Sequence, residues 1–263
     1  MARPQMGAKL KEHQMKGAEV MIALDVSNSM LARDYSPDRL DRAKLAISRL
    51  VDKLNGDRIG LVLFAGTSFV QLPITTDYVS AKMFLNNIST ESVPVQGTAM
   101  GDAINTCIRS FSAQSEKSRA IIVITDGENH EDDPVSAAKQ AAEMGISVYT
   151  IGVGSEQGQP IPMKGGLLKD SEGNIVVTKL DESTLRDVAR AGNGAYVHAG
   201  NDEFGLNPII DNVRKLDEEQ FSSVVFEEYD EQYMYFFAIA LALFVIQMMV
   251  GERKVLRHLF DKK

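Results

Sequence analysis

Three oxygen-bearing side chains stand at alternate positions where the first apolar segment of the chain ends. They are Asp25, Ser27 and Ser29, directly after residues 20–24. One carboxylate and two hydroxyls are hard oxygen donors, which suit a small hard cation such as Mg²⁺. The alternative is a helix cap, because Ser and Asp after a strand commonly cap the next helix. The motif alone is too short to decide between a metal site and a cap.

Two later loops carry further oxygen donors. Thr98 stands in the run Gln-Gly-Thr-Ala-Met-Gly, and Asp126 directly follows the apolar residues 120–125. Asp25 and Asp126 therefore both come at the carboxyl end of an expected strand. Ligands of open parallel sheets bind at this edge of the sheet. We therefore expect the loops of Asp25 and Asp126 to lie together.

Apolar runs alternate with segments of helical spacing along most of the chain. We expect strands at 20–24, 59–65, 120–125, 146–153 and 195–198, and helices at 38–54, 77–88, 100–111, 134–144, 182–191 and 202–216. Residues 68–72 are expected to return as a short antiparallel strand beside 59–65. The alternation predicts an α/β fold, a mostly parallel sheet with helices on both faces. The Gly-rich residues 155–178 break the pattern and are interpreted as a surface insertion containing a hairpin.

The three motifs, in this order, resemble the von Willebrand factor A (VWA) domain over residues 18–216. The resemblance implies a Rossmann-like, doubly wound sheet with one short antiparallel edge strand. It also implies a metal-ion-dependent adhesion site with five ligands: Asp25, Ser27, Ser29, Thr98 and Asp126. The implied ion is Mg²⁺, with Mn²⁺ or Ca²⁺ as alternatives. In binding members of the family, a carboxylate of a protein partner completes the coordination.

A narrower resemblance rests on residues 19–32, residues 37–44 and the apolar C-terminal segment. These are similar to the bacterial aerotolerance-operon (Bat) proteins. That resemblance implies a protein that helps to assemble an envelope complex, with sister VWA proteins and a MoxR-type AAA+ ATPase as partners. It also implies membrane helices ahead of the domain, so residues 1–17 are expected to be a lead-in that follows such helices.

The C-terminal region departs from the composition of a soluble domain. Residues 233–250 contain no charge and are about long enough for a transmembrane helix. The preceding residues 217–232 form an acidic linker, and residues 251–263 form a basic tail. Short basic flanks stay on the cytoplasmic side. We therefore expect a cytoplasmic tail and a VWA domain on the other side of the membrane, and the resemblance to the Bat proteins implies that this is the periplasmic side of the inner membrane. The alternative, a cytoplasm-facing adaptor of the ATPase, requires the opposite orientation.

Composition excludes some functions. The net charge of −8 makes nucleic acid an unsuitable partner. The single cysteine, Cys107, lies on the apolar face of an expected helix and is interpreted as a buried thiol. An enzyme in which Mg²⁺ activates water is a further alternative, with Glu128 and His130 close to Asp126 as candidate bases. We interpret the acidic run 128–133 as a solvated loop face and expect no catalysis.

Overall fold

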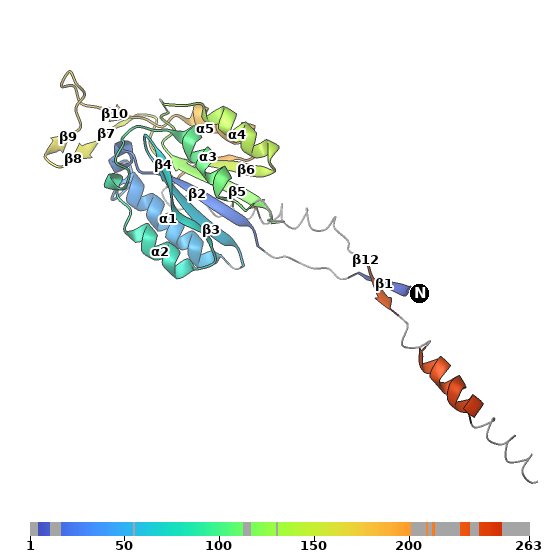
Figure 1. Cartoon of the computed structure of the whole chain (residues 1–263). Coiled ribbons are helices and arrows are strands. Elements are labelled where there is room, and N and C mark those ends of the chain that lie inside the picture. Colours follow the sequence, from blue (N-terminus) through green and yellow to red (C-terminus); the bar gives the residue numbers. More distant parts are fainter. Residues whose placement is uncertain are drawn as a thin grey trace, which may run out of the picture. The chain divides into compact units, whose positions relative to one another are not determined.

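The computed structural model describes residues 5–10, 17–54, 56–112, 117–129, 131–200, 209, 212–213, 227–231 and 237–248 (Figure 1). The chain divides into two compact units. One comprises Met15–Gln220, and the other comprises Met1–Gln14 together with Phe221–Lys263. Each unit is described by itself.

A six-stranded sheet forms the centre of the larger unit, in the order β11-β6-β5-β2-β3-β4. Its strands are β2 (Glu19–Asp25), β3 (Arg58–Phe64), β4 (Ser68–Thr75), β5 (Arg119–Thr125), β6 (Ile146–Gly152) and β11 (Tyr196–His198). All neighbouring pairs run parallel except β3 and β4, which are antiparallel. The structure therefore confirms a mostly parallel α/β sheet with one antiparallel edge strand.

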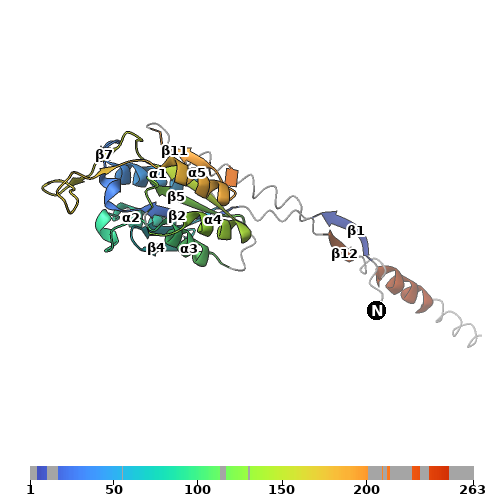
Figure 2. The ribbon, with the colours of Figure 1, turned by 90° about the horizontal axis from the view of Figure 1, so that it is seen from above.

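Five α-helices cover the two faces of this sheet (Figures 1 and 2). They are α1 (Arg39–Lys53), α2 (Tyr78–Asn86), α3 (Met100–Ser110), α4 (Pro134–Glu143) and α5 (Glu182–Ala191). Side chains of α1 and α2 pack into one buried cluster, and those of α3, α4 and α5 pack into another. Alternate residues of β2 enter the two clusters, as the two-residue period of a strand requires: Ile22 enters the first and Ala23 the second.

Aspartates cap four of the helices. Asp38, Asp77, Asp133 and Asp181 each accept a hydrogen bond from the backbone N–H three residues later. Helix α3 begins differently, because the carboxylate of Asp132 accepts the N–H groups of Gly101 and Asp102 at 2.9 and 2.7 Å. Residues 131–133 are exposed, in agreement with the expected solvated face, and Asp132 in addition caps a helix distant in the sequence.

The insertion contains more strands than the single hairpin expected. Strand β7 (Gln159–Pro160) pairs with β10 (Val177–Thr178), and β8 (Pro162–Met163) pairs with β9 (Gly166–Leu167). The hairpin expected within the insertion is present, with Lys169 and Ile175 paired across it. The β8–β9 hairpin extends away from the central sheet (Figure 1).

The smaller unit contains a strand pair that the sequence pattern did not predict. Strand β1 (Gln5–Leu10), inside the expected lead-in, pairs antiparallel with β12 (Glu227–Glu231), inside the expected acidic linker. Residues 237–248 are helical. Within the described ranges, no helix has both the length and the apolar character needed to cross a membrane.

Several expectations concern residues outside the described part of the chain. The ends of the expected span 233–250 and all of the tail 251–263 fall there. Of the expected helix 202–216, only residues 209, 212 and 213 are described, and they are helical. His130 also lies outside the described residues.

Candidate metal centre

Asp25 is the last residue of β2, and its carboxylate is fully buried. One oxygen accepts the backbone N–H of Ser27 at 2.8 Å, which closes a turn directly after the strand. The other oxygen accepts the hydroxyl of Thr125 at 2.6 Å. Thr125 ends the neighbouring strand β5, so two adjacent strand ends fix the orientation of this carboxylate.

Ser27 and Ser29 lie with their hydroxyl oxygens 2.9 Å apart in the turn that follows. The hydroxyl of Ser29 also hydrogen-bonds the Asp126 carboxyl group. Ser27 precedes the short helix η1 (Asn28–Leu31), but its side chain makes no capping hydrogen bond there. Asp38 caps α1 instead, with its carboxylate 2.8 Å from the N–H of Asp41. The structure therefore does not support the interpretation of these serines as helix caps.

Asp126 follows β5 and is also fully buried. One of its carboxylate oxygens accepts the Arg39 guanidinium at 3.0 Å and the Thr178 hydroxyl at 2.9 Å. The other accepts the backbone N–H of Glu128 at 3.3 Å. The Asp126 carboxylate is therefore held on one side by a cation and a hydroxyl group.

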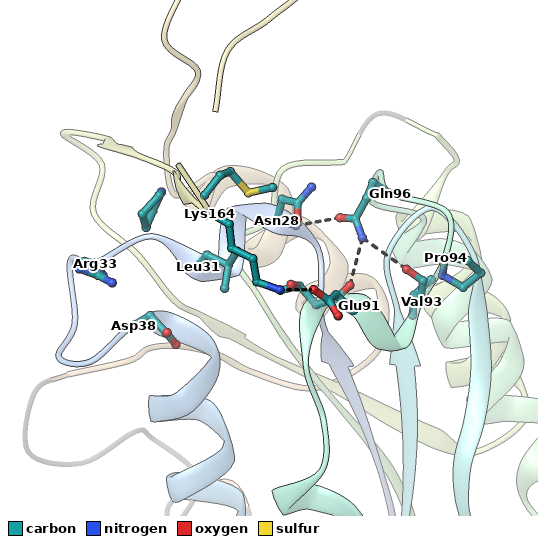
Figure 3. A pocket seen from close by; sticks show the side chains of 12 residues that line it. Asn28, Leu31, Arg33, Asp38, Glu91, Val93, Pro94, Gln96 and Lys164 are labelled. Carbon is teal, nitrogen blue, oxygen red and sulfur yellow. Dashed lines mark hydrogen bonds and ion pairs between the residues drawn. The ribbon is translucent and has the colours of Figure 1, made fainter. Parts of the chain in front are cut away.

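Thr98 is buried in the loop between helix η2 (Thr90–Ser92) and α3. No hydrogen bond joins it to the other four predicted ligands among the described residues. Its loop is nevertheless tied to theirs, because the Gln96 side chain accepts the N–H of Asn28 at 3.0 Å (Figure 3). The N–H of Ala99 also bonds the carbonyl oxygen of Ala65, just after β3, at 2.7 Å.

Two buried carboxyl groups lie close together in the site, and a bound cation would stabilise their charged forms. Burial, together with repulsion from Asp126, raises the pKa of Asp25 to about 7. Burial also raises the pKa of Asp126, although the Arg39 guanidinium opposes that shift. Buried carboxylates are stable only when they are paired, protonated or bound to metal. Two such carboxylates with hydroxyl oxygens beside them suit a hard divalent cation, and the assignment of the five residues as ligands remains a prediction.

Arg39 and Asp34 form a part of the site that sequence reasoning missed. The two carboxylate oxygens of Asp34 accept hydrogen bonds from Nε and Nη2 of Arg39 at 2.8 and 2.7 Å. Asp34 also accepts the N–H of Ser155 at 2.8 Å. The sequence contained one indication of this ion pair. Arg39 lies four residues before Ala43, at a spacing that places it on the buried face of α1. A charge on such a face indicates a buried ion pair.

The candidate base Glu128 makes a structural contact, and the single cysteine is buried. The Glu128 carboxylate accepts the backbone N–H of Lys179 at 2.9 Å, which ties the loop after β5 to the end of the insertion. Cys107 is a free thiol buried on α3, as expected.

Comparison with known proteins identifies similar folds and sequences. Residues 19–191 match the model of the von Willebrand factor type A domain. An aerotolerance-related membrane protein from Bacteroides fragilis is 50% identical, with a TM-score of 0.73 over 76% of this chain and all of that one. BatB from Bacteroides thetaiotaomicron is 51% identical, with a TM-score of 0.72 over 79% of this chain and all of that one.

More distant comparisons support the fold. Proximal thread matrix protein 1 of the mussel byssus, solved with a zinc-occupied MIDAS motif, is 20% identical, with a TM-score of 0.56 over 76% of this chain and 45% of that one. At that identity the likeness concerns the fold alone. The curated bacterial relatives are longer: this chain spans 74% of one and 51–58% of seven others.

Proposed function

Because this chain belongs to the von Willebrand factor type A family, and within it to the aerotolerance-related Bat group that includes BatB, we propose that it is a metal-dependent protein-binding module. A partner protein supplies a carboxylate to a divalent cation at the sheet edge. The cation is held by Asp25, Ser27, Ser29, Thr98 and Asp126. The observation that carries the proposal is the pair of buried carboxylates, Asp25 and Asp126, beside linked serine hydroxyls.

The residues of the chain orient the donors before any partner arrives. Thr125 and the N–H of Ser27 hold the Asp25 carboxylate, and Arg39 with Thr178 hold one oxygen of Asp126. A cation bound among them supplies an electrophilic centre that accepts an oxygen ligand from outside. Hydroxyl ligands are neutral, so they leave the cation enough charge to bind an incoming carboxylate strongly.

We propose Mg²⁺ as the ion, with Mn²⁺ or Ca²⁺ as alternatives, because every predicted ligand atom is an oxygen. Hard cations prefer oxygen ligands, whereas thiolate and imidazole favour softer metals. The mussel protein with zinc at its MIDAS motif supports divalent metal binding on this fold.

For the cellular setting, we propose an inner-membrane protein with its VWA domain in the periplasm. The name of the Bacteroides fragilis relative, an aerotolerance-related membrane protein, supports membrane attachment. The uncharged residues 233–250 and the basic residues 251–263 support the orientation. The proposed partners are sister VWA proteins and a MoxR-type AAA+ ATPase, in an envelope complex related to aerotolerance.

Two rival functions make different predictions. A cytoplasm-facing adaptor of the ATPase places the C-terminal tail outside, so an alkaline phosphatase fusion at Lys263 would be active there and inactive under our proposal. A metal-dependent hydrolase needs a free base near the cation. The Glu128 carboxylate already accepts the N–H of Lys179, so the described contacts favour a structural role, and we propose no catalysis.

The test of the binding function is crosslinking in native membranes followed by recovery of the tagged full chain. Wild type, Asp25→Ala and the exposed control Asp187→Ala are compared with and without chelator. We expect a specific set of crosslinked proteins with wild type and Asp187→Ala, and its loss with Asp25→Ala or chelator. Recovery of the same set under all conditions would refute metal-dependent binding.

A further inference from the structure

A groove adjoins the candidate metal centre, with a volume of about 700 Å³. We propose that it binds an extended, acidic and apolar segment of the partner protein, and that the β8–β9 hairpin of the insertion forms one of its walls. This inference rests on the proposed function, because the cation would hold one carboxylate of the same segment. It adds a second contact region, which selects among carboxylate-bearing partners.

Asp38, the N-cap of α1, and three further parts of the chain build the groove (Figure 3). One is the η1 region from Asn28 to Arg33, the second is the η2 region from Thr90 to Gln96, and the third is the hairpin from Pro162 to Lys164. Asn28 stands between two predicted metal ligands, Ser27 and Ser29. The groove therefore begins where the partner's carboxylate would be bound.

Hydrogen bonds of one side chain join two of the walls. The Gln96 side chain accepts the N–H of Asn28 and donates to the carbonyl oxygens of Thr90 and Val93 at 3.1 and 3.3 Å (Figure 3). The third wall is joined more weakly, by an ion pair of 3.0 Å between Lys164 and Glu91. These two side chains are 95% and 78% exposed, and exposed ion pairs contribute little. An incoming carboxylate can therefore replace Glu91 beside Lys164.

The lining has apolar and cationic parts. Leu31, Val93, Pro94 and Met163 offer apolar surface, and Met163 is 40% exposed. Methionine adapts its shape to different partners. Arg33 and Lys164 are balanced by two carboxylates of the same lining, Asp38 and Glu91. The proposed cation therefore supplies the excess positive charge, and together with the apolar lining it makes the groove complementary to a segment that carries both acidic and apolar side chains.

The base of the insertion contacts the same residues that orient the metal ligands. At one end, the N–H of Ser155 bonds Asp34 at 2.8 Å, and Asp34 is paired with Arg39. At the other end, the hydroxyl of Thr178 bonds Asp126 at 2.9 Å. The insertion that carries the hairpin is therefore anchored beside the metal centre at both of its ends.

The experiment uses the full chain in detergent and three fluorescein-labelled nonapeptides, each with one central Asp. The flanking residues are Leu and Glu in the first, Leu and Lys in the second, and Ser and Gly in the third. Fluorescence anisotropy in the presence of Mg²⁺ measures binding. We expect the first peptide to bind wild type about tenfold or more tightly than either of the others. Equal affinities, or no binding of any peptide, would overturn the inference.

Two variants test the groove directly. Met163→Asp should weaken binding of the first peptide about tenfold, and Arg33→Glu should weaken it by a similar factor and favour the second peptide. The matched controls are Ile175→Asp, on the insertion outside the groove, and Arg49→Glu, exposed on α1; both should bind as wild type does. Thermal unfolding of every variant verifies that the fold is intact.

Asp25→Ala separates this inference from the proposed function. If Asp25→Ala abolishes binding while Met163→Asp and Arg33→Glu bind as wild type, the groove inference is wrong and the metal-dependent function stands. If Asp25→Ala and chelator leave binding unchanged while the two groove variants weaken it, the groove is correct and the metal-dependent function is wrong.

Discussion

The Arg39 guanidinium donates to the Asp126 carboxylate at 3.0 Å, and neither side chain is exposed to solvent. The same guanidinium forms two hydrogen bonds with Asp34. The planar guanidinium suits this arrangement, because two of its nitrogens bind Asp34 and the third binds Asp126. This one residue of α1 therefore connects the loop after β2, the loop after β5 and the insertion.

Replacing Arg39 should destabilise the fold strongly. Arg39→Met leaves two carboxylates without their cation, and breaking a buried ion pair in this way costs about 3–5 kcal/mol. Arg39→Lys should recover only part of that loss, because an ammonium group lacks the planar fork. Urea unfolding followed by circular dichroism measures both. Arg49→Met, at an exposed position of the same helix, should change stability by less than about 0.5 kcal/mol. A loss of that small size for Arg39→Met would show that the ion pair is unimportant.

Saturating Mg²⁺ should stabilise wild type and leave Asp25→Ala unaffected. A ligand that binds only the folded state at 100 times its dissociation constant stabilises it by about 2.7 kcal/mol. Thermal unfolding with Mg²⁺ and with chelator detects this shift. Asp77→Ala, which removes an exposed cap on α2, should lower the unfolding temperature while keeping the response to Mg²⁺. An equal response to Mg²⁺ in Asp25→Ala would place the ion elsewhere.

Gly154 packs directly against Arg39. Its φ is +139°, and a Cβ there would come within 2.8 Å of the guanidinium carbon. Gly165 offers a matched comparison, because its φ is +105° and nothing lies within 4 Å of its Cβ position. Gly165→Ala should cost about 1–2 kcal/mol through backbone strain alone. Gly154→Ala should cost about 1–3 kcal/mol more, because the extra carbon displaces a packed side chain. Equal losses in urea unfolding would argue against this packing.

Cys107 should be unreactive in the folded protein. Burial on α3 raises the pKa of the Cys107 thiol well above its usual value, so almost no thiolate forms near neutral pH. We expect Ellman's reagent to modify none of the native protein within minutes, and one thiol per chain after denaturation in guanidinium. Rapid modification of the native chain would show that α3 opens readily.

The sequence predicted an element correctly where the residues of that element and its neighbouring turn were enough to identify it. Strand β2 is apolar because both of its faces are buried, and its boundary is visible because Asp25 follows directly. The antiparallel β4 was recognisable from the short turn before Ser68. Strands β1 and β12 were not predicted, because both are short and they are paired across more than 200 residues of chain. β12 is almost entirely acidic, and the alternation of Met6, Ala8 and Leu10 in β1 is too brief to distinguish a strand from an irregular segment.

Some residues of the candidate site could be recognised from the sequence, and the roles of others depend on tertiary contacts. Asp25, Ser27 and Asp126 were identifiable because each lies at or next to the end of a strand. The roles of Asp34, Arg39 and Thr178 depend on helix α1 and the insertion meeting at the sheet edge. Such side-chain contacts are tertiary, and the spacing of residues in the sequence gives only one hint of them, a charged residue on a buried helical stripe.

The hydrogen bonds of Ser155 and Thr178 have a consequence for how relatives of this protein diverge. They close the insertion at its base, so the chain between them forms a loop whose ends are fixed. Doubling the length of a flexible loop costs only about 0.6 kcal/mol in closure entropy. Hairpins of different length and sequence can therefore be exchanged between these two anchors while the sheet and the metal ligands stay in place. The hairpin can in this way differ between relatives without a change in the rest of the domain.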